Sequence, residues 1–156
     1  MMGKTCFFIG HRNTKPEVEP KLAEEIERHI VEYGVDSFVV GHYGQFDSMA
    51  AHAVIQAKLK HPEITLTLLL PYHPTVRPIK TPKGHDGTYY PPGMETVPPK
   101  LAIVKANEHM VQNSEYLIAY VAHPSQGSRE LLEYALKRQK RGLIQVTNLS
   151  GWYPEI

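Results

Sequence analysis

Short apolar runs alternate along the chain with segments whose apolar residues recur at helical spacing, and this alternation constrains the fold most. Residues 5–9 form an apolar stretch typical of a strand that is buried on both faces. Residues 19–33 then place Leu22, Ile26 and Ile30 on one helical stripe. The same patterns predict further strands at 37–41, 65–70, 116–121 and 143–146, and further helices at 47–60, 99–113 and 127–141.

Strands and helices in this order require right-handed crossovers between parallel strands. The sequence therefore predicts an α/β fold: a Rossmann-like three-layer sandwich with a mainly parallel, five-stranded sheet and helices on both faces. With 156 residues and 42% hydrophobic content, we expect a single domain over residues 1–156. In such sheets a ligand binds beyond the carboxyl ends of the strands.

Residues 72–99 are predicted to form a long proline-rich loop, because they contain seven prolines and three glycines. A loop of this length in a compact domain is usually functional or disordered. Tyr72, Tyr89 and Tyr90 within it could stack on a base, although aromatic residues in a long loop more often fix it to the body of the protein.

The composition excludes several classes of function. A formal net charge of +1 gives no long-range attraction to nucleic acid, so a nucleic-acid partner is not indicated. No apolar run is long enough to span a bilayer, and we expect no membrane partner. The single cysteine, Cys6, and the absence of a signal peptide pattern favour a cytoplasmic protein. Neither a G-x-G-x-x-G motif nor a P-loop occurs, and we expect no cofactor.

A histidine follows each of the first four predicted strands within two or three residues: His11, His42, His73 and His123. Loops carry polar residues in any case, which is one interpretation of this pattern. Hydrogen bonding to a ribose, base or phosphate is a second. Imidazole is also a common metal ligand, but carboxylates are few near these positions, so we predict no metal site.

Two loops have features that suit a phosphate group. Gly10-His11-Arg12 offers a glycine for close backbone approach and a guanidinium whose planar fork matches phosphate oxygens. Gly127-Ser128 opens a predicted helix, whose free amides and positive dipole end attract anions. The alternative for the second loop is a simple helix cap, since serine is a common capping residue.

A second glycine-bearing turn follows the predicted strand at 37–41. Gly41 and Gly44 lie in this turn, and Asp47 would hold a ribose hydroxyl or only cap the next helix, with the cap favoured. Glu130 and Glu133 lie early on a predicted helix, where acidic residues suit the helix dipole in any case. They are also the candidates for a catalytic acid or base.

The chain resembles the SLOG superfamily, in its branch of small YpsA-like bacterial and phage proteins. The segments that carry the resemblance follow one another in order over nearly the whole chain: CFFIGHR (6–12), GQFD (44–47), LLPY (69–72), YYPP (89–92), VPPK (97–100), NEHMV (107–111), SEYLIAY (114–120) and GSRELLEYA (127–135).

This resemblance implies a Rossmann-like fold that binds a nucleotide-derived small molecule. Similar proteins include the Lonely-guy phosphoribohydrolases, which release a base from a nucleoside monophosphate, and the DNA-processing protein DprA. This chain departs from the pattern in three places. Ser125-Gln126-Gly127-Ser128 stands where the family commonly has Gly-Gly before the last helix, Leu131 stands where the hydrolases have a glutamate, and Ala106 stands where the branch tends to have an arginine.

The leading expectation is binding of a nucleotide-derived small molecule at the carboxyl ends of the strands, as in a sensor. Gly10, Arg12, Gly127 and Ser128 would hold phosphate, and His11, Gly41, Gly44, Asp47 and Tyr72 would line the base or ribose side. The alternatives are a nucleotide N-glycosidase that uses Glu130 or Glu133, and an interaction scaffold that uses the proline-rich loop. Whether the chain is an enzyme stays open. The resemblance also favours a homodimer, since superfamily relatives pair through surface helices.

Overall fold

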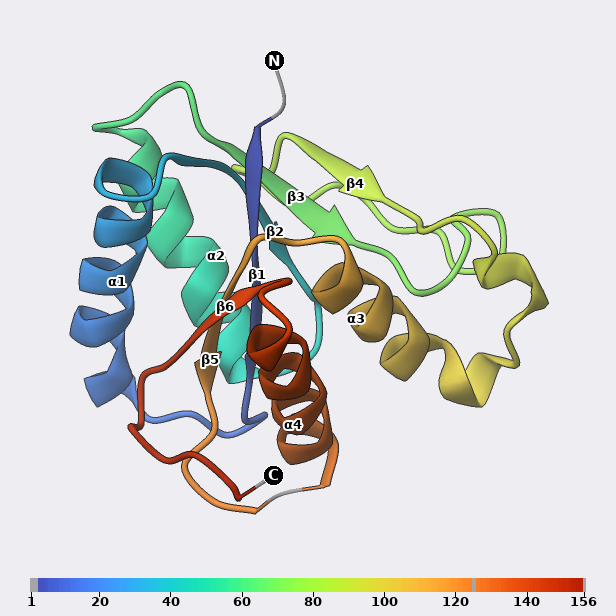
Figure 1. Ribbon diagram of the computed structural model, residues 1–156. Coiled ribbons are helices and arrows are strands. Elements are labelled where there is room, and N and C mark those ends of the chain that lie inside the picture. The colour runs from blue at the N-terminus through green and yellow to red at the C-terminus, as the bar shows by residue number, and fades with distance from the viewer. Residues whose placement is uncertain (1–2, 125, 156) are drawn as a thin grey trace.

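The computed structural model describes residues 3–124 and 126–155, and its centre is a sheet in which all strand pairs are parallel (Figure 1). The strands are β1 (Lys4–Gly10), β2 (Val35–Val40), β3 (Thr65–Leu69), β4 (Gly87–Tyr89), β5 (Tyr116–Tyr120) and β6 (Gln145–Asn148). The helices are α1 (Glu19–Val31), α2 (Gln45–Lys58), α3 (Ala102–Gln112) and α4 (Gln126–Lys140), with short 3-10 turns at Pro16–Val18, Met94–Thr96 and Pro99–Leu101. The predicted Rossmann-like α/β fold is confirmed.

The sheet has six strands rather than the predicted five, because the proline-rich segment 72–99 contributes β4 at one edge. Asp86 fixes this strand to the body of the protein. Its backbone amide donates to the carbonyl of Leu66 at 2.7 Å, and its carboxylate accepts the amide of Leu66 at 2.8 Å and pairs with Lys58. β4 was not predicted because its sequence, Gly-Thr-Tyr, is short, only partly buried and surrounded by prolines.

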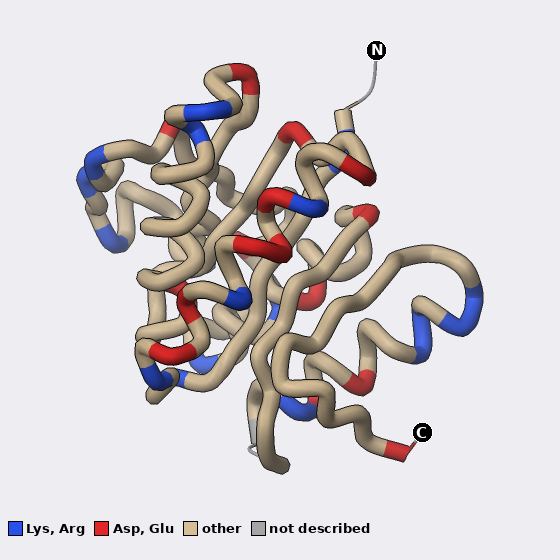
Figure 2. Tube along the Cα trace, turned by 90° about the vertical axis from the view of Figure 1, so that its left-hand side faces the viewer, with Lys and Arg blue, Asp and Glu red and all other residues tan. Residues whose placement is uncertain are grey.

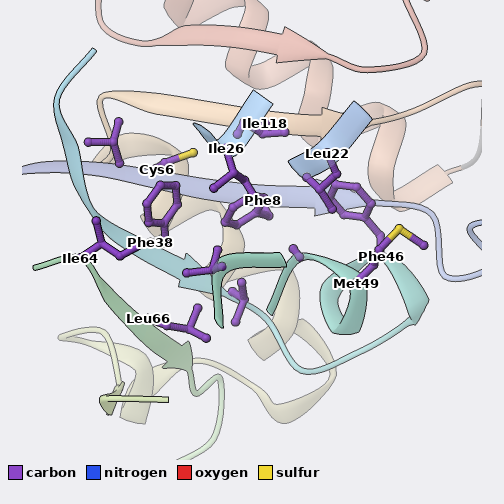
Figure 3. Close-up of a cluster of buried hydrophobic side chains, with 14 of the residues drawn as sticks. Cys6, Phe8, Leu22, Ile26, Phe38, Phe46, Met49, Ile64, Leu66 and Ile118 are labelled. Atoms are coloured by element: carbon purple, nitrogen blue, oxygen red, sulfur yellow. The ribbon is translucent and has the colours of Figure 1, made fainter. Parts of the chain in front are cut away.

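Two helices cover each face of the sheet. Figure 1 shows α1 and α2 on one side and α3 and α4 on the other. Alternate side chains of β1 supply both cores, as the pleat of a strand requires. Phe8 packs beneath α1 and α2, where its ring stacks on Phe38 at 5.9 Å (Figure 3), whereas Phe7 and Ile9 pack beneath α3 and α4.

The strand order β4-β3-β2-β1-β5-β6 puts β1 and β5 side by side at the middle of the sheet. Strands β2 to β4 extend from β1 in one direction, and β5 and β6 extend in the other. The connections therefore reverse direction between β1 and β5. In an open parallel sheet this switch point opens a crevice beyond the carboxyl ends of the two strands, and ligands bind there.

Helix α2 begins earlier than the sequence predicted. Its N-cap is Gly44, whose φ of 108° favours glycine, and the helix starts at Gln45. Asp47 is therefore the third residue of the helix and not its cap, and the prediction of a capping role is wrong. Its carboxylate instead accepts the backbone amide of Tyr43, before the helix, at 3.1 Å.

Charged residues of both signs are spread over the trace, as the small net charge requires (Figure 2). Within residues 3–124 and 126–155, no helix combines the length and the apolar character needed to cross a membrane.

Candidate functional site

A pocket of about 560 Å³ lies beyond the carboxyl ends of β1 and β5, at the switch point of the sheet. Its volume falls in the range of small-molecule sites. The loop after β1, the start of α2, one side of α3 and the first turns of α4 form its walls. Its polar lining consists of His11, Arg12, Asn13, Tyr43, Asp47, Asn107, Glu108, His123, Ser128, Glu130 and Tyr134.

Arg12 and the first turn of α4 are the positively charged and positively polarised parts of the pocket lining. Arg12 is exposed, and its guanidinium makes no ion pair with the part of the chain that the structure describes. Gly127 and Ser128 line the same pocket at the start of α4, where a helix leaves backbone amides without intrahelical partners. The hydroxyl of Ser128 donates to the carbonyl of Gly10 at 3.1 Å, so its proton is already committed.

Two of the predicted site glycines, Gly10 and Gly44, have packing roles that the sequence did not reveal. A Cβ atom on Gly10 would collide with the ring of Phe46, which α2 presses against the end of β1. A Cβ atom on Gly44 would lie 3.0 Å from the Cα of Arg12. These glycines let the start of α2 approach the loop after β1, and that approach shapes one wall of the pocket.

His11 lines the pocket but is held by the protein itself. Its side chain is buried, and Nε2 accepts the backbone amide of Ala122 at 2.8 Å. Its ring stacks on that of His123 with centroids 3.9 Å apart. Burial, and then the neighbouring His123, lower the pKa of His11 below its ordinary value. A neutral imidazole at this position fixes the loop after β1 to the loop after β5.

Asp47 is the pocket carboxyl whose acidity is most changed by its surroundings. It is half-buried, and burial raises its pKa to about 7, against the opposing effect of the hydrogen bond from the amide of Tyr43. Gly41 makes room for it, because a Cβ atom there would lie 2.7 Å from the Asp47 carboxylate oxygen. Asp47 can therefore donate or accept a proton near neutral pH.

Most of the sequence-predicted site residues line this pocket. Those that do are Gly10, His11, Arg12, Gly41, Asp47, Gly127, Ser128 and Glu130. Gly44, Tyr72 and Glu133 are not among its lining residues. Gly44 instead lies close to the backbone of Arg12, as described above. The hydroxyl of Tyr72 donates to the carbonyl of Pro99 at 3.2 Å, and Glu133 pairs with Arg129 at 3.6 Å along α4.

Sequence reasoning missed the contribution of α3 to the pocket. Asn107 and Glu108 line it from this helix, and Tyr134 lines it from α4. Asn107 and Glu108 belong to one of the segments that carry the SLOG resemblance, which is the signal that could have drawn attention to them.

The histidines at the strand ends separate into two groups. His11 and His123 line the pocket, whereas His42 packs edge-on against Tyr43 and His73 packs edge-on against Tyr90. Among the described residues, no group of three or more histidine, cysteine or acidic side chains is arranged to hold a metal ion.

Tyr89 and Tyr90 attach the proline-rich segment to the rest of the protein. Tyr90 packs against both hydrophobic cores, and the hydroxyl of Tyr89 lies 2.8 Å from Nε2 of His109 on α3. Neither tyrosine lines the pocket. Of the two interpretations of these aromatic residues, the structure favours fixing the segment over stacking on a base.

Comparison with solved structures places the chain among Rossmann-like proteins. DNA processing protein A from Helicobacter pylori, which binds single-stranded DNA, aligns with 94% of this chain and 76% of its own at 17% identity and a TM-score of 0.58. The molybdenum cofactor binding protein of Rippkaea orientalis aligns over 95% and 91% of the two chains at 16% identity and a TM-score of 0.55.

The molybdenum cofactor carrier protein of Chlamydomonas reinhardtii is a third such structure. It aligns over 96% and 93% of the two chains at 14% identity and a TM-score of 0.54. No protein-family model matches this chain, and no curated protein sequence matches it. At such low identities these likenesses show a shared fold, and the ligand has to be argued from the pocket itself.

Proposed function

We propose that the pocket binds a nucleotide-derived small molecule that carries a phosphate group. The observation that supports this most directly is the placement of Arg12 and the first turn of α4 in one pocket at the switch point. Arg12 is a permanent cation that has no ion-pair partner among the described residues, and it lines the same pocket as the helix amides. Together these groups suit an anionic group of the ligand. In the remainder of the lining, the uncharged side chains suit a base and the carboxyl groups suit the hydroxyls of a ribose.

The donors and acceptors of the pocket come from both sides of β1. Asp47 comes from the β2 side, through α2, whereas Ser128 and Glu130 come from the β5 side, through α4. Carboxylates accept hydrogen bonds from ribose hydroxyls, and the amide of Asn107 can both donate to and accept from a base. A phosphate bound at Arg12 would leave these groups for the remainder of a nucleotide.

We further propose that the chain is a YpsA-like member of the SLOG superfamily, in which residues 1–156 form one cytoplasmic, sensor-like domain that pairs as a homodimer. The order of the shared sequence segments and the Rossmann-like neighbours support the superfamily part of this proposal. Leu131 at the position of the hydrolase glutamate favours binding over catalysis. The neighbours differ in ligand, with single-stranded DNA for one and the molybdenum cofactor for the other two, and leave the ligand of this chain open.

Isothermal titration with the four ribonucleoside 5′-monophosphates and the matching nucleosides tests the binding proposal. We expect one monophosphate to bind at least about tenfold more tightly than its nucleoside, because a charge-assisted contact with Arg12 contributes about 1.5–3 kcal/mol. Arg12→Ala should remove most of this difference. Arg141→Ala is the control, since Arg141 is an exposed arginine after α4 that does not line the pocket.

Equal affinity for a nucleoside and its monophosphate would contradict the role of Arg12 in holding phosphate. If no monophosphate binds, and none raises the melting temperature of the protein, the binding proposal itself is wrong.

A nucleotide N-glycosidase is the second candidate, because the carboxyl groups of Asp47, Glu108 and Glu130 all line the pocket. In this reaction the bond between the base and C1′ breaks and the oxygen of a water molecule bonds to C1′. One proton of that water ends on the departing base. A carboxylate would accept the water proton and a protonated carboxyl would donate to the base. Asp47, with its pKa of about 7, suits either step.

Incubation with the same monophosphates, followed by chromatography for free base, tests this candidate. Glu130→Gln should abolish base release if Glu130 is the working acid. Glu133→Gln is a matched control, because Glu133 lies one turn further along the same helix but does not line the pocket. Absence of base release from the wild-type protein would leave binding as the function.

A further inference from the structure

A second groove, of about 530 Å³, lies on the other side of the loop that connects β1 to α1. Its polar lining consists of Asn13, Thr14, Lys15, Glu19, Gln45, Ser48 and His52. None of the residues predicted to bind ligand lines it. Asn13 lines both this groove and the pocket, so the two spaces meet at that residue.

The wall between the pocket and the groove is a single layer of chain. Along the loop, His11 and Arg12 line the pocket and Thr14 lines the groove; along α2, Asp47 lines the pocket and Ser48 lines the groove. Hydrogen bonds within this layer hold it together.

Gln45, at the start of α2, makes two of these hydrogen bonds. Its backbone amide donates to the carbonyl of Arg12 at 2.8 Å, and its side-chain oxygen accepts the amide of Thr14 at 3.0 Å. These two hydrogen bonds fix the loop to α2. Arg12 and Asn13 of this loop are exposed, and we refer to these two residues as the ridge.

The ridge and the groove present polar groups that the protein does not use. The side chains of Asn13, Lys15 and His52 are exposed and make no hydrogen bond or ion pair with the described residues. Because the oxygen of the Gln45 amide is taken by Thr14, its nitrogen is the end that can face a ligand. Glu19 adds one acceptor for hydroxyl or amino groups, and Met49 adds an apolar surface.

These positions form a line of charge and hydrogen bonding from one space to the other. Arg12 and Lys15 are both exposed cations, three residues apart, on opposite sides of Asn13. A linking phosphate that crosses the ridge would meet Arg12 on the pocket side of Asn13, the Asn13 amide itself, and Lys15 on the groove side. Beyond the ridge, His52 offers a ring for stacking or a donor, and Glu19 an acceptor for a second ribose.

We propose that the groove is a second subsite and that the ligand of this protein contains two nucleoside units joined through phosphate. One unit occupies the pocket, the linking phosphate lies across the ridge, and the second unit occupies the groove beside Lys15 and His52. This inference rests on the proposed function, because it takes the first unit to be a nucleotide in the pocket.

Titration calorimetry with adenosine 5′-monophosphate, diadenosine pyrophosphate and adenylyl-(3′→5′)-adenosine tests the proposal. We expect at least one of the two-unit ligands to bind about tenfold or more tightly than the monophosphate, since its second half binds at high effective concentration. Whichever binds more tightly identifies the linkage as a pyrophosphate or a phosphodiester. The same comparison with guanine-containing ligands covers a different base preference.

Variants then localise the gain in affinity. Lys15→Ala and His52→Ala should each reduce the advantage of the two-unit ligand and leave the affinity for the monophosphate within about twofold. Lys21→Ala is the matched control for Lys15, because Lys21 is an exposed lysine on α1 that does not line the groove. Circular dichroism verifies that each variant is folded.

Several outcomes would overturn this inference while sparing the proposed function. One is a monophosphate that binds as tightly as both two-unit ligands. Another is an unchanged advantage of the two-unit ligand in both variants. A third is a single-stranded oligonucleotide that binds far more tightly than either two-unit ligand, which would make the groove part of a nucleic-acid channel. If neither monophosphates nor two-unit ligands bind, the proposed function fails instead.

Discussion

The imidazole rings of His11 and His123 stack face to face, with centroids 3.9 Å apart and planes inclined by only 2°. His11 follows β1 and His123 follows β5, so this stack joins the loops of the two strands that flank the switch point. Nε2 of His11 accepts the amide of Ala122, and the neutral ring therefore carries its proton on Nδ1. Burial and the neighbouring His123 both lower the pKa of His11 and so favour its neutral form.

Replacing His123 should raise the pKa of His11. Burial lowers the pKa of His11 from its ordinary value of 6.5, and the neighbouring His123 lowers it further. His123→Ala removes the second cause and admits water to one face of the His11 ring. Nitrogen-15 titration of the histidine rings measures the change. His42→Ala is the control and should leave the His11 pKa unchanged, because the His42 ring packs on Tyr43. An unaltered His11 titration in His123→Ala would contradict the coupling.

Asp47→Asn should stabilise the protein, and more so at pH 8 than at pH 5. Burial raises the folded-state pKa of Asp47 from 3.8 to about 7, so between these values the folded protein binds a proton that the unfolded chain releases. Stability from this group is thus lost as the pH rises through that window. Asparagine stays neutral and can still accept the amide of Tyr43.

The expected gain at pH 8 is about 1–2 kcal/mol in the free energy of unfolding, less than the full pKa shift implies because solvent in the pocket screens the charge. Urea unfolding at the two pH values measures it. Asp36→Asn is the control, since Asp36 is an exposed carboxylate at the far end of β2. A gain that is equal at both pH values would show that Asp47 titrates normally.

The predictability of this fold from sequence depended on burial. Strands β1, β2, β3 and β5 are largely buried and contain short apolar runs, whose length and flanking glycines or prolines favour strands over helices. β4 lies at the edge, and two of its three residues are exposed. Its position is determined by pairing with β3 and by the contacts of Asp86 with Leu66 and Lys58, which a local pattern does not contain.

The residues of the candidate site that could be predicted are those whose position follows from the order of strands and loops alone. Loops after parallel strands meet at one edge, so Arg12 and Ser128 could be brought together from sequence. Asn107 and Glu108 could not be placed in the pocket from sequence, because they are half-buried at the edge of the apolar face of α3. The helical periodicity of α3 does not indicate which part of the protein lies beside that edge. Tyr72 lies near the same edge, yet its hydroxyl is directed to Pro99 and it does not line the pocket.

Gly10→Ala should destabilise the protein by about 1–3 kcal/mol, because the added methyl group would collide with the buried ring of Phe46. Phe46→Ala removes the two nearest atoms, Cγ and Cδ2, and should relieve most of this collision. The cost of Gly10→Ala in the Phe46→Ala background is then expected to fall by about 1 kcal/mol or more, a coupling that a double-mutant cycle in urea measures. Gly87→Ala, where an added methyl group would meet no neighbouring atom, is the control. Additive effects of the two substitutions would show that Phe46 is not the obstacle.

Ser128→Ala should lower stability and leave the affinity for a monophosphate nearly unchanged. The Ser128 hydroxyl donates to the carbonyl of Gly10 and so ties the start of α4 to the end of β1. Loss of this partly buried hydrogen bond should cost about 0.5–1.5 kcal/mol in the free energy of unfolding. Because the hydroxyl proton is committed to Gly10, phosphate would be held by Arg12 and the backbone amides of α4, which the alanine variant retains. Urea unfolding and calorimetry with the best-binding monophosphate separate the two roles. A tenfold loss of affinity with unchanged stability would show instead that Ser128 turns its hydroxyl to the ligand.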